Sequence, residues 1–166
     1  MTSSDESGLA GGFEVELCAL YKQALKVSQQ DADMLQLACR ENSFKAWPFP
    51  DTSGCNSKAM AEAGWYHAPT AGEPDLVRCC VCGKEMEGWE IDDDPLIEHR
   101  RNPKCEFLKF HDRLLSQNKT EADMTVEDYL LLESARMQHI VTLLMAKIET
   151  DFSDFREEIA SMEVEL

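Results

Sequence analysis

The stretch RCCVCGKEMEGWEIDDDPLIEHRRNPKC, residues 78–105, combines several kinds of metal-ligand side chain in twenty-eight residues. It holds four of the seven cysteines and one of the four histidines, together with seven carboxylates between Glu85 and Glu98. Cysteine and histidine at close spacing are typical of metal sites. Carboxylates at this density are typical of a surface that binds a cation or faces solvent. The stretch therefore indicates both a metal and a charged partner.

Four side chains in this stretch have the spacing of a zinc site: Cys79, Cys82, His99 and Cys105. A Cys-x-x-Cys turn places two sulfurs on one edge of a tetrahedron, and a helical histidine with a cysteine one or two turns later closes it. Four protein ligands leave no open position, so the sequence predicts one structural Zn²⁺ whose binding contributes to folding. The alternative is a group of buried or free thiols. Cys80 is interpreted as a packing residue and Cys55 as a buried one, whereas Cys18 and Cys39 carry no signal.

Residues on either side of this stretch predict an α+β zinc domain with a small three-stranded sheet. A short helix capped by Ser57 is expected to end at Gly64, followed by a strand at 65–67. Two further strands are expected around a turn at 82–84, and a helix after the acidic run 92–94.

The complete predicted order is a lead-in at 1–12, an amphipathic helix at 13–33, the zinc domain at 34–112, a linker at 113–124 and a long helix at 125–166. In the first helix, apolar residues recur at Phe13, Leu17, Leu20, Tyr21 and Ala24. Packing of this helix on the domain is the simplest role for it.

The last helix has a coiled-coil pattern with steps of three and four and one stutter. Its apolar stripe consists of Met137, Val141, Leu144, Ile148, Phe152, Phe155, Ile159 and Met162. A helix of this length spans about 60 Å, whereas a domain of this size is about 30 Å across. The helix must therefore project from the domain, and we expect its stripe to bind partner helices.

Charge and composition exclude several classes of function. A net charge of −16 argues against direct DNA binding and favours a basic partner. No apolar run is long enough for a membrane span, and the odd, clustered cysteines are typical of a reducing compartment, so a soluble intracellular protein is expected. Thiols that hold zinc cannot act as nucleophiles, and no second Cys/His set for a ubiquitin-ligase RING follows Cys105. We therefore expect no enzyme activity.

At these residues the chain resembles the baculovirus inhibitor-of-apoptosis repeat, or BIR, family. The family pattern is Cys-x2-Cys-x16-His-x6–8-Cys, and only the last gap here is one residue shorter, so the loop RRNPK is expected to be tight. Other matching positions are Arg40, Phe44, Trp47-Pro48, Gly54-Cys55, Met60-Ala61, Ala63-Gly64, Gly83 and Gly88-Trp89. Over about residues 38–135 the chain is most similar to the survivin group, which has a single BIR before one long helix. An invertebrate or otherwise divergent member is expected.

The resemblance implies a non-catalytic adaptor of the chromosomal passenger complex. The long helix would bundle with helices of borealin and the inner centromere protein, and so localise Aurora B kinase indirectly. The expected locations are the nucleus, the centromere of chromosomes and the spindle midzone, with a cytoplasmic pool. The BIR would bind the free amino terminus of a histone tail that carries a phosphothreonine.

The residues implied for this peptide site are Lys84, Met86, Glu87, Trp89, Asp93 and Glu98. Glu87 and Asp93 would hold the α-ammonium, and Glu98 would lie near the basic residues of the peptide. Met86 and Trp89 would form an apolar wall, and Lys84 would contact the phosphate. The family's second phosphate-side residue is a histidine, and this chain departs from it with Asn102 at the aligned position, or Arg101 if the one-residue gap falls earlier. The alternative is a solvated acidic face with a helix cap at Asp92–Asp94.

Two other interpretations stay open. Some BIR proteins inhibit apoptosis by binding caspases or the N-terminal-alanine peptides of their antagonists through the same groove. The resemblance also implies a homodimer for the chain without partners, with contacts from Phe110, Leu114, Leu115, Val126 and Tyr129.

Overall fold

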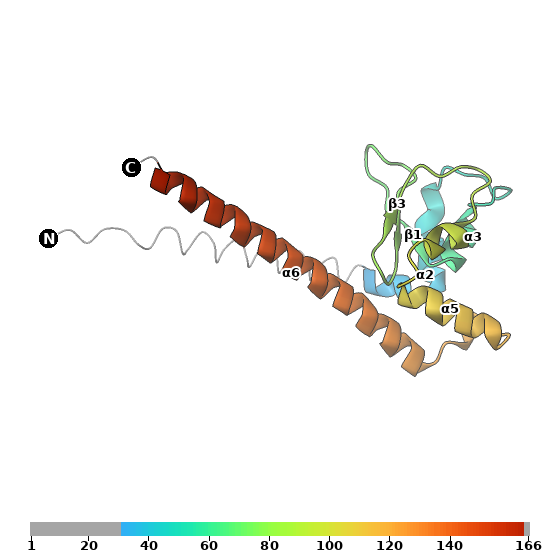
Figure 1. The fold of residues 1–166 in the computed structure, drawn as a ribbon. Coiled ribbons are helices and arrows are strands. Elements are labelled where there is room, and N and C mark those ends of the chain that lie inside the picture. Colours follow the sequence, from blue (N-terminus) through green and yellow to red (C-terminus); the bar gives the residue numbers. More distant parts are fainter. Residues whose placement is uncertain (1–30, 165–166) are drawn as a thin grey trace.

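The computed structural model describes residues 31–164, and its centre is a three-stranded antiparallel sheet. The strands are β1 (Trp65–His67), β2 (Val77–Cys79) and β3 (Glu85–Met86). β2 is the central strand: its Cys79 lies opposite Trp65 of β1, and its Val77 lies opposite Met86 of β3. Short helices surround this sheet and one long helix leaves it (Figure 1). The predicted α+β domain with a projecting C-terminal helix is confirmed.

The α-helices are short except for the last two. The helical elements are η1 (Asp33–Leu35), α2 (Leu37–Ser43), η2 (Phe44–Ala46), α3 (Ser57–Glu62), α4 (Pro95–Arg100), α5 (Glu106–Ser116), η3 (Glu121–Asp123) and α6 (Val126–Val164). The predicted cap of α3 was wrong by one residue, because the Asn56 side chain accepts the Ala59 N–H at 3.0 Å and Ser57 is already helical. The predicted stop at Gly64 is confirmed by its φ of +86°.

The core lies between the sheet, α3 and α5. Its largest fully buried apolar side chains are Trp65, Phe107, Leu35, Met60 and Leu132. Phe107 of α5 packs so closely on Gly64 that a Cβ there would lie 2.5 Å from the ring. The chain after α3 therefore needs glycine both for its backbone conformation and for the ring above it.

Arg40 of α2 connects four segments from the centre of the domain. Its guanidinium is fully buried and donates to the carbonyl oxygens of Met34, Leu35 and Ala61 at 2.8–3.2 Å. It also donates two hydrogen bonds, 2.6 and 2.7 Å long, to the carboxylate of Glu121 in η3. The segment before α6 is thus bound to the domain through a buried ion pair.

Helix α5 extends to Ser116, so the predicted linker 113–124 begins as helix. α6 then starts where Thr125 and Asp128 exchange hydrogen bonds in the predicted capping box. Arg113 of α5 also pairs with Asp128. The bonds from Thr125 come first among the interactions that lower the pKa of Asp128 to about 2. These contacts fix the direction in which α6 departs.

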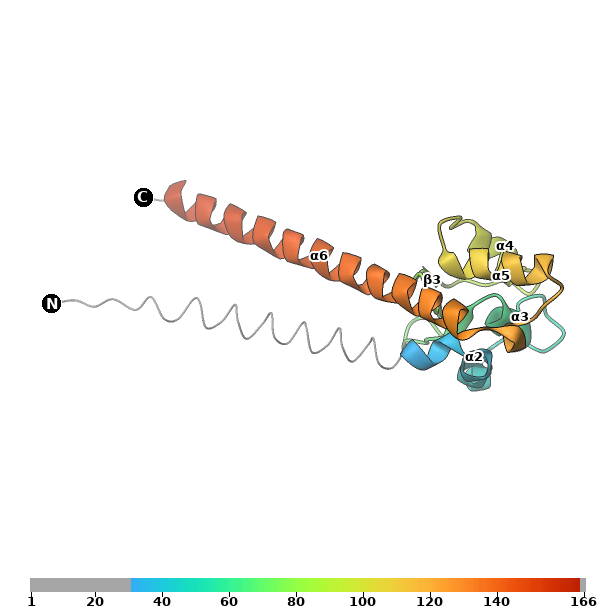
Figure 2. The same ribbon diagram turned by 90° about the horizontal axis from the view of Figure 1, so that it is seen from below.

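Only the first part of α6 packs on the domain, through Leu132 and Arg136, which are 1% and 4% exposed. The rest projects away from it in both views (Figures 1 and 2). Among residues 31–164, none of the helices is both long and apolar enough to cross a membrane. The predictions for residues 1–12, and for all but the last residues of 13–33, lie outside the described part of the chain.

Candidate metal centre and acidic groove

The first two predicted ligands lie on a tight turn after β2. The backbone N–H groups of Val81 and Cys82 both point at the Cys79 sulfur, with N–S distances of 3.4 Å. The turn closes at Gly83, whose N–H donates to the Cys79 carbonyl at 3.1 Å and whose φ is +64°. Both sulfurs therefore face the same point.

His99 reaches that point from α4. Asp94 caps this helix by accepting the N–H groups of Leu96 and Ile97 at 2.9 and 3.1 Å, and Pro95 occupies the first turn. The His99 Nδ1 atom lies 2.7 Å from the Ala63 carbonyl oxygen. This bond directs Nε2 to the sulfurs, as an outer-shell partner does for a metal-bound histidine.

Cys105 completes the set just before α5. Two consecutive turns close the short gap after His99, since the Asn102 N–H donates to the His99 carbonyl at 2.9 Å and the Cys105 N–H to the Asn102 carbonyl at 3.1 Å. The loop RRNPK is thus as tight as expected. Cys105 is 1% exposed, and no disulfide forms among the cysteines of residues 31–164.

The four ligand atoms fit one zinc ion. All lie within 4.8 Å of one another; the Cys79 and Cys105 sulfurs are 3.8 Å apart, and so are the Cys82 sulfur and His99 Nε2. A tetrahedral zinc with sulfurs at about 2.3 Å has ligand atoms about 3.8 Å apart. The predicted site for one structural zinc, held by Cys79, Cys82, His99 and Cys105, is confirmed.

Because the cysteine ligands are largely buried, their thiolates need a nearby cation to be stable. Desolvation raises the pKa of the Cys79 thiol well above its ordinary value. A bound metal supplies the positive charge that stabilises buried thiolates. The Asn102 side chain supports it by donating to the Cys82 sulfur at 3.3 Å. Asn102, the position considered for a phosphate contact, thus contacts a ligand of the metal site.

An acidic groove of about 270 Å³ lies beside the metal centre. Its lining residues are Met86, Glu87, Gly88, Trp89, Glu90, Asp93, Glu98 and Arg101. Five of the six predicted peptide residues thus surround one cavity. Lys84 does not line it; the Lys84 ammonium donates to the Glu98 carbonyl at 3.2 Å, at the groove's edge. The groove therefore brings together carboxylates from two segments. Glu87 and Glu90 follow β3, whereas Asp93 precedes α4 and Glu98 lies on it.

The groove residues differ in how exposed they are and in whether their carboxylates already have a partner in this chain. Glu87 is fully exposed, whereas Asp93 accepts the Glu90 N–H at 2.8 Å with one of its oxygens. Glu98 pairs with Arg101 at 2.9 Å. Trp89, expected as part of an apolar wall, is only 6% exposed and lies under the groove with its ring against Trp65. Asp94 from the same acidic run has a structural role as the α4 cap.

Two carboxylates of this region were missed from the sequence. Glu73 comes first among the groups that raise the pKa of Glu87, and Asp75 contributes to the same effect. Asp75 also accepts the Trp89 N–H at 2.8 Å. They come from the loop before β2, and only the antiparallel pairing of β2 with β3 places them there. No local pattern could have indicated it.

The predicted partner face of α6 is largely exposed. Val141, Phe155 and Ile159 are 52%, 50% and 43% exposed, and Met137 and Phe152 are 37% and 47% exposed. Leu144 and Ile148 are half-buried, and the side chain of Met162 lies outside the described part. By helical geometry this face points away from Leu132, which packs on the domain.

The predicted dimer contact needs correction. Phe110 and Leu114 are 2% and 4% exposed because α5 buries them in the core of this chain. Leu115 and Val126 are 59% and 76% exposed, and Tyr129 is half-buried. Only these last three could contribute to a dimer surface.

Comparisons with known proteins agree with this geometry. Residues 40–109 match the Inhibitor of Apoptosis domain, BIR. The chain is 37% identical over 118 residues to baculoviral IAP repeat-containing protein 5 of Rattus norvegicus, covering 70% of this chain and 78% of the rat protein. It is 40% identical over 119 residues to protein 5.1-A of Xenopus laevis, covering 71% and 70%. With protein 5.2-A of Xenopus laevis the identity is 31% over 137 residues, covering 80% and 83%.

Proposed function

Because the chain belongs to the BIR family, in the group of baculoviral IAP repeat-containing protein 5, or survivin, we propose that it is a non-enzymatic adaptor of the chromosomal passenger complex. The zinc domain would bind a histone tail, and α6 would bundle with borealin-like and inner-centromere-protein-like helices. The complex would localise Aurora B kinase to centromeres and the spindle midzone.

The observation that carries this proposal is that two surfaces suited to different partners lie on separate parts of one chain. The acidic groove is on the zinc domain, next to α4. The exposed apolar face is on α6, along a length that projects beyond that domain (Figure 2). An adaptor needs this separation, since both partners must be bound at once.

The groove suits a free peptide amine. An α-ammonium is a small cation that is bound best by carboxylates near an apolar surface. Glu87 and Asp93 supply the carboxylates, and half-buried Met86 supplies apolar surface. Arg101 lines the groove and Lys84 lies at its edge, and these cations would face the phosphate of a phosphothreonine.

A calorimetric titration of the zinc-loaded full chain with histone-tail peptides tests this half of the proposal. We expect the free, phosphorylated peptide to bind and amino-terminal acetylation to weaken it at least tenfold. Asp93→Ala should remove the preference for a free amine. Asp92→Ala is the control, because that side chain is exposed and does not line the groove.

Two outcomes would contradict the histone-tail reading. Equal weak binding of all peptides would reject amine recognition altogether. Tight binding of N-terminal-alanine peptides, with no gain from phosphate, would instead support the apoptosis-inhibitor interpretation.

Co-purification with the partner helices tests the other half. Phe155→Asp with Ile159→Asp should release the helices and leave the peptide affinity unchanged. Thr150→Asp with Ser153→Asp adds the same charge on the opposite side of α6 and should retain them. If the first variant keeps its partners, the face is assigned incorrectly.

A further inference from the structure

The zinc domain exposes few large apolar side chains, and two of them adjoin the acidic groove. In the described part of the chain, only Ile91, Ile97 and Leu115 are large, apolar, exposed and outside α6. Ile91 and Ile97 are 53% and 60% exposed. Ile91 lies on the turn between Glu90 and Asp93, and both ends of this turn line the groove. Exposed apolar surface is therefore found beside the carboxylates proposed to bind a peptide amine.

Ile97 lies on the first turn of α4, at the edge of the same groove. Pro95 and His99, two residues before and after it, are buried, so the exposed Ile97 side chain points away from the core. Residues four apart on a helix are neighbours, and the residue four positions after Ile97 is Arg101, which lines the groove. Glu98, which also lines the groove, is the next residue of the helix. Ile97 therefore stands on the rim of the groove.

The backbone at both isoleucines is held by hydrogen bonds. The Gly54 N–H donates to the Ile91 carbonyl at 2.7 Å, and a Cβ on Gly54 would lie 2.6 Å from the Asp93 carbonyl oxygen. The Ile97 N–H donates at 3.1 Å to the Asp94 carboxylate that caps α4. A ligand that contacts these side chains therefore does not have to order the backbone that carries them, so less affinity is lost to entropy.

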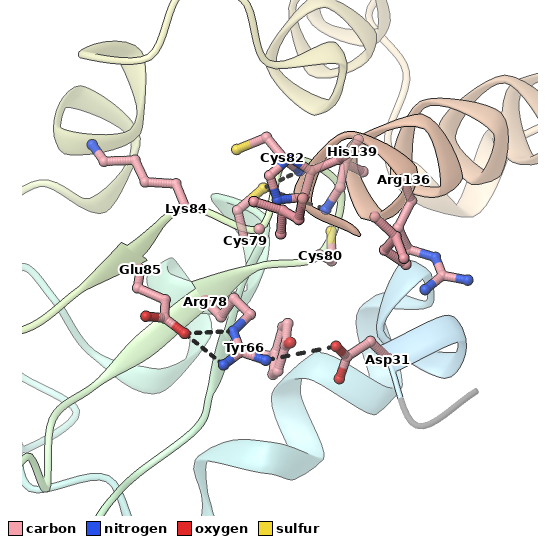
Figure 3. Close-up of a pocket in the computed structure, with 14 residues that line it drawn as sticks. Asp31, Tyr66, Arg78, Cys79, Cys80, Cys82, Lys84, Glu85, Arg136 and His139 are labelled. Atoms are coloured by element: carbon pink, nitrogen blue, oxygen red, sulfur yellow. Dashed lines mark hydrogen bonds and ion pairs between the residues drawn. The ribbon is translucent and has the colours of Figure 1, made fainter. Parts of the chain in front are cut away.

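The surface around the isoleucines is acidic. Residues 87–98 contain six carboxylates and neither lysine nor arginine. Figure 3 shows Glu85 turned to Arg78 in the cleft beside α6, whereas the Lys84 side chain extends away from the metal-binding turn. Lys84, at the edge of the groove, and Arg101, in its lining, offset two of the six charges, so the surface keeps a net negative charge. A ligand that fits it carries cations as well as an apolar side chain.

We propose that Ile91 and Ile97 form an apolar rim that binds an aliphatic side chain of the same peptide whose amine the groove binds. The occupant is one extended basic peptide, with its amine at Asp93 and a nearby aliphatic side chain on the exposed isoleucines. An extended peptide advances about 3.3 Å per residue and one turn of α4 about 5.4 Å, so we expect that side chain at one of positions 2–5. The inference rests on the proposed peptide binding and adds a sequence preference to it.

Calorimetric titration of the zinc-loaded full chain tests the rim. The probes are the histone-tail phosphopeptide and copies with a single leucine at each of positions 2–5 except that of the phosphothreonine, all made with and without the phosphate. We expect leucine at one of these positions to raise the affinity about fivefold, which is what burial of about half an aliphatic side chain contributes. Ile91→Ser with Ile97→Ser should remove that gain and leave the affinity for the parent phosphopeptide within about twofold.

Leu115→Ser is the matched control, because Leu115 is 59% exposed but lies on α5 and does not line the groove. This variant should keep the gain from leucine. No gain at any position, or a gain that survives in the double isoleucine variant, would overturn the rim. Loss of parent binding from a double variant that still holds its zinc would also overturn it, because the isoleucines would then support the groove and not bind a ligand side chain.

Failure of the rim and failure of the proposed function give different results. If the parent phosphopeptide binds with its preference for a free amine but leucine adds nothing, the rim fails and the proposed function stands. If the leucine peptides bind through the isoleucines and the phosphate adds nothing, the rim stands and the histone-tail function fails. If no peptide binds any of the proteins, both fail.

Discussion

The Nδ1 atom of His99 lies 2.7 Å from the carbonyl oxygen of Ala63, the C-cap residue of α3. The next residue, Gly64, accepts the Cys80 N–H at 3.0 Å through its own carbonyl. The end of one short helix therefore positions both the histidine and the cysteine turn. A shift of the backbone at residues 63 and 64 would therefore also move the metal ligands.

Gly64→Ala should lower the free energy of unfolding by about 3 kcal/mol, because overpacking and a positive φ each cost on the order of 1–3 kcal/mol. The new Cβ would meet the Phe107 ring. Denaturant unfolding with zinc present measures the change. Gly72→Ala is the control, since a Cβ there has nothing within 4 Å. Equal stability of the two variants would contradict the packing described.

Asn102→Ala should weaken zinc binding by about tenfold, the lower end of typical outer-shell effects. The amide donates to the Cys82 sulfur and would otherwise offset charge on that thiolate. Competition with a chromophoric chelator gives the affinity. Asn42→Ala, at an exposed position of α2, should leave it unchanged.

Arg40→Met should destabilise the domain by about 3–5 kcal/mol, because the partner carboxylate of a broken buried pair loses its counter-charge. Glu121, the partner, has a side chain only 9% exposed. Lys58→Met, which removes a surface pair with Glu62, should change stability by less than about 1 kcal/mol. Chemical denaturation of both variants checks this, and a small effect of Arg40→Met would show that α2 does not depend on η3.

Glu87→Gln should raise thermal stability slightly at neutral pH while it weakens binding of a peptide amine. Repulsion from Glu73 and then Asp75 raises the pKa of Glu87, so the folded state is penalised above that pKa. The penalty disappears as pH falls through the raised pKa. Melting curves from pH 7 downward should show the gain shrinking. Glu62→Gln is the control, because Glu62 does not line the groove, and a gain of equal size there would contradict the repulsion.

The metal ligands were predictable because cysteine and histidine at this spacing within one short stretch are typical of zinc sites. A Cys-x-x-Cys turn, a capped helix and a short loop each specify geometry over a few residues. The strand at 65–67 and the start of α6 at Thr125 and Asp128 were found in the same way.

What the sequence did not reveal depends on contacts between distant segments. The sequence predicted Phe110 and Leu114 as dimer contacts, but α5 buries both side chains in the core of the domain. The Arg40–Glu121 pair joins residues far apart in the chain, and Asp75 reaches Trp89 across a strand pairing. The aromatic side chain of Trp89 suggested a groove wall, but in the structure its ring packs edge to face with the ring of Trp65.

Metal content and ligand distances, measured on the full chain by elemental analysis and X-ray absorption, test the zinc centre most directly. We predict one zinc per chain, with three sulfurs at about 2.3 Å and one nitrogen at about 2.0 Å. Chelation should unfold the domain, since structural zinc contributes on the order of 10 kcal/mol. A folded, metal-free protein, or one whose Cys79, Cys82 and Cys105 are found in disulfides, would contradict the account.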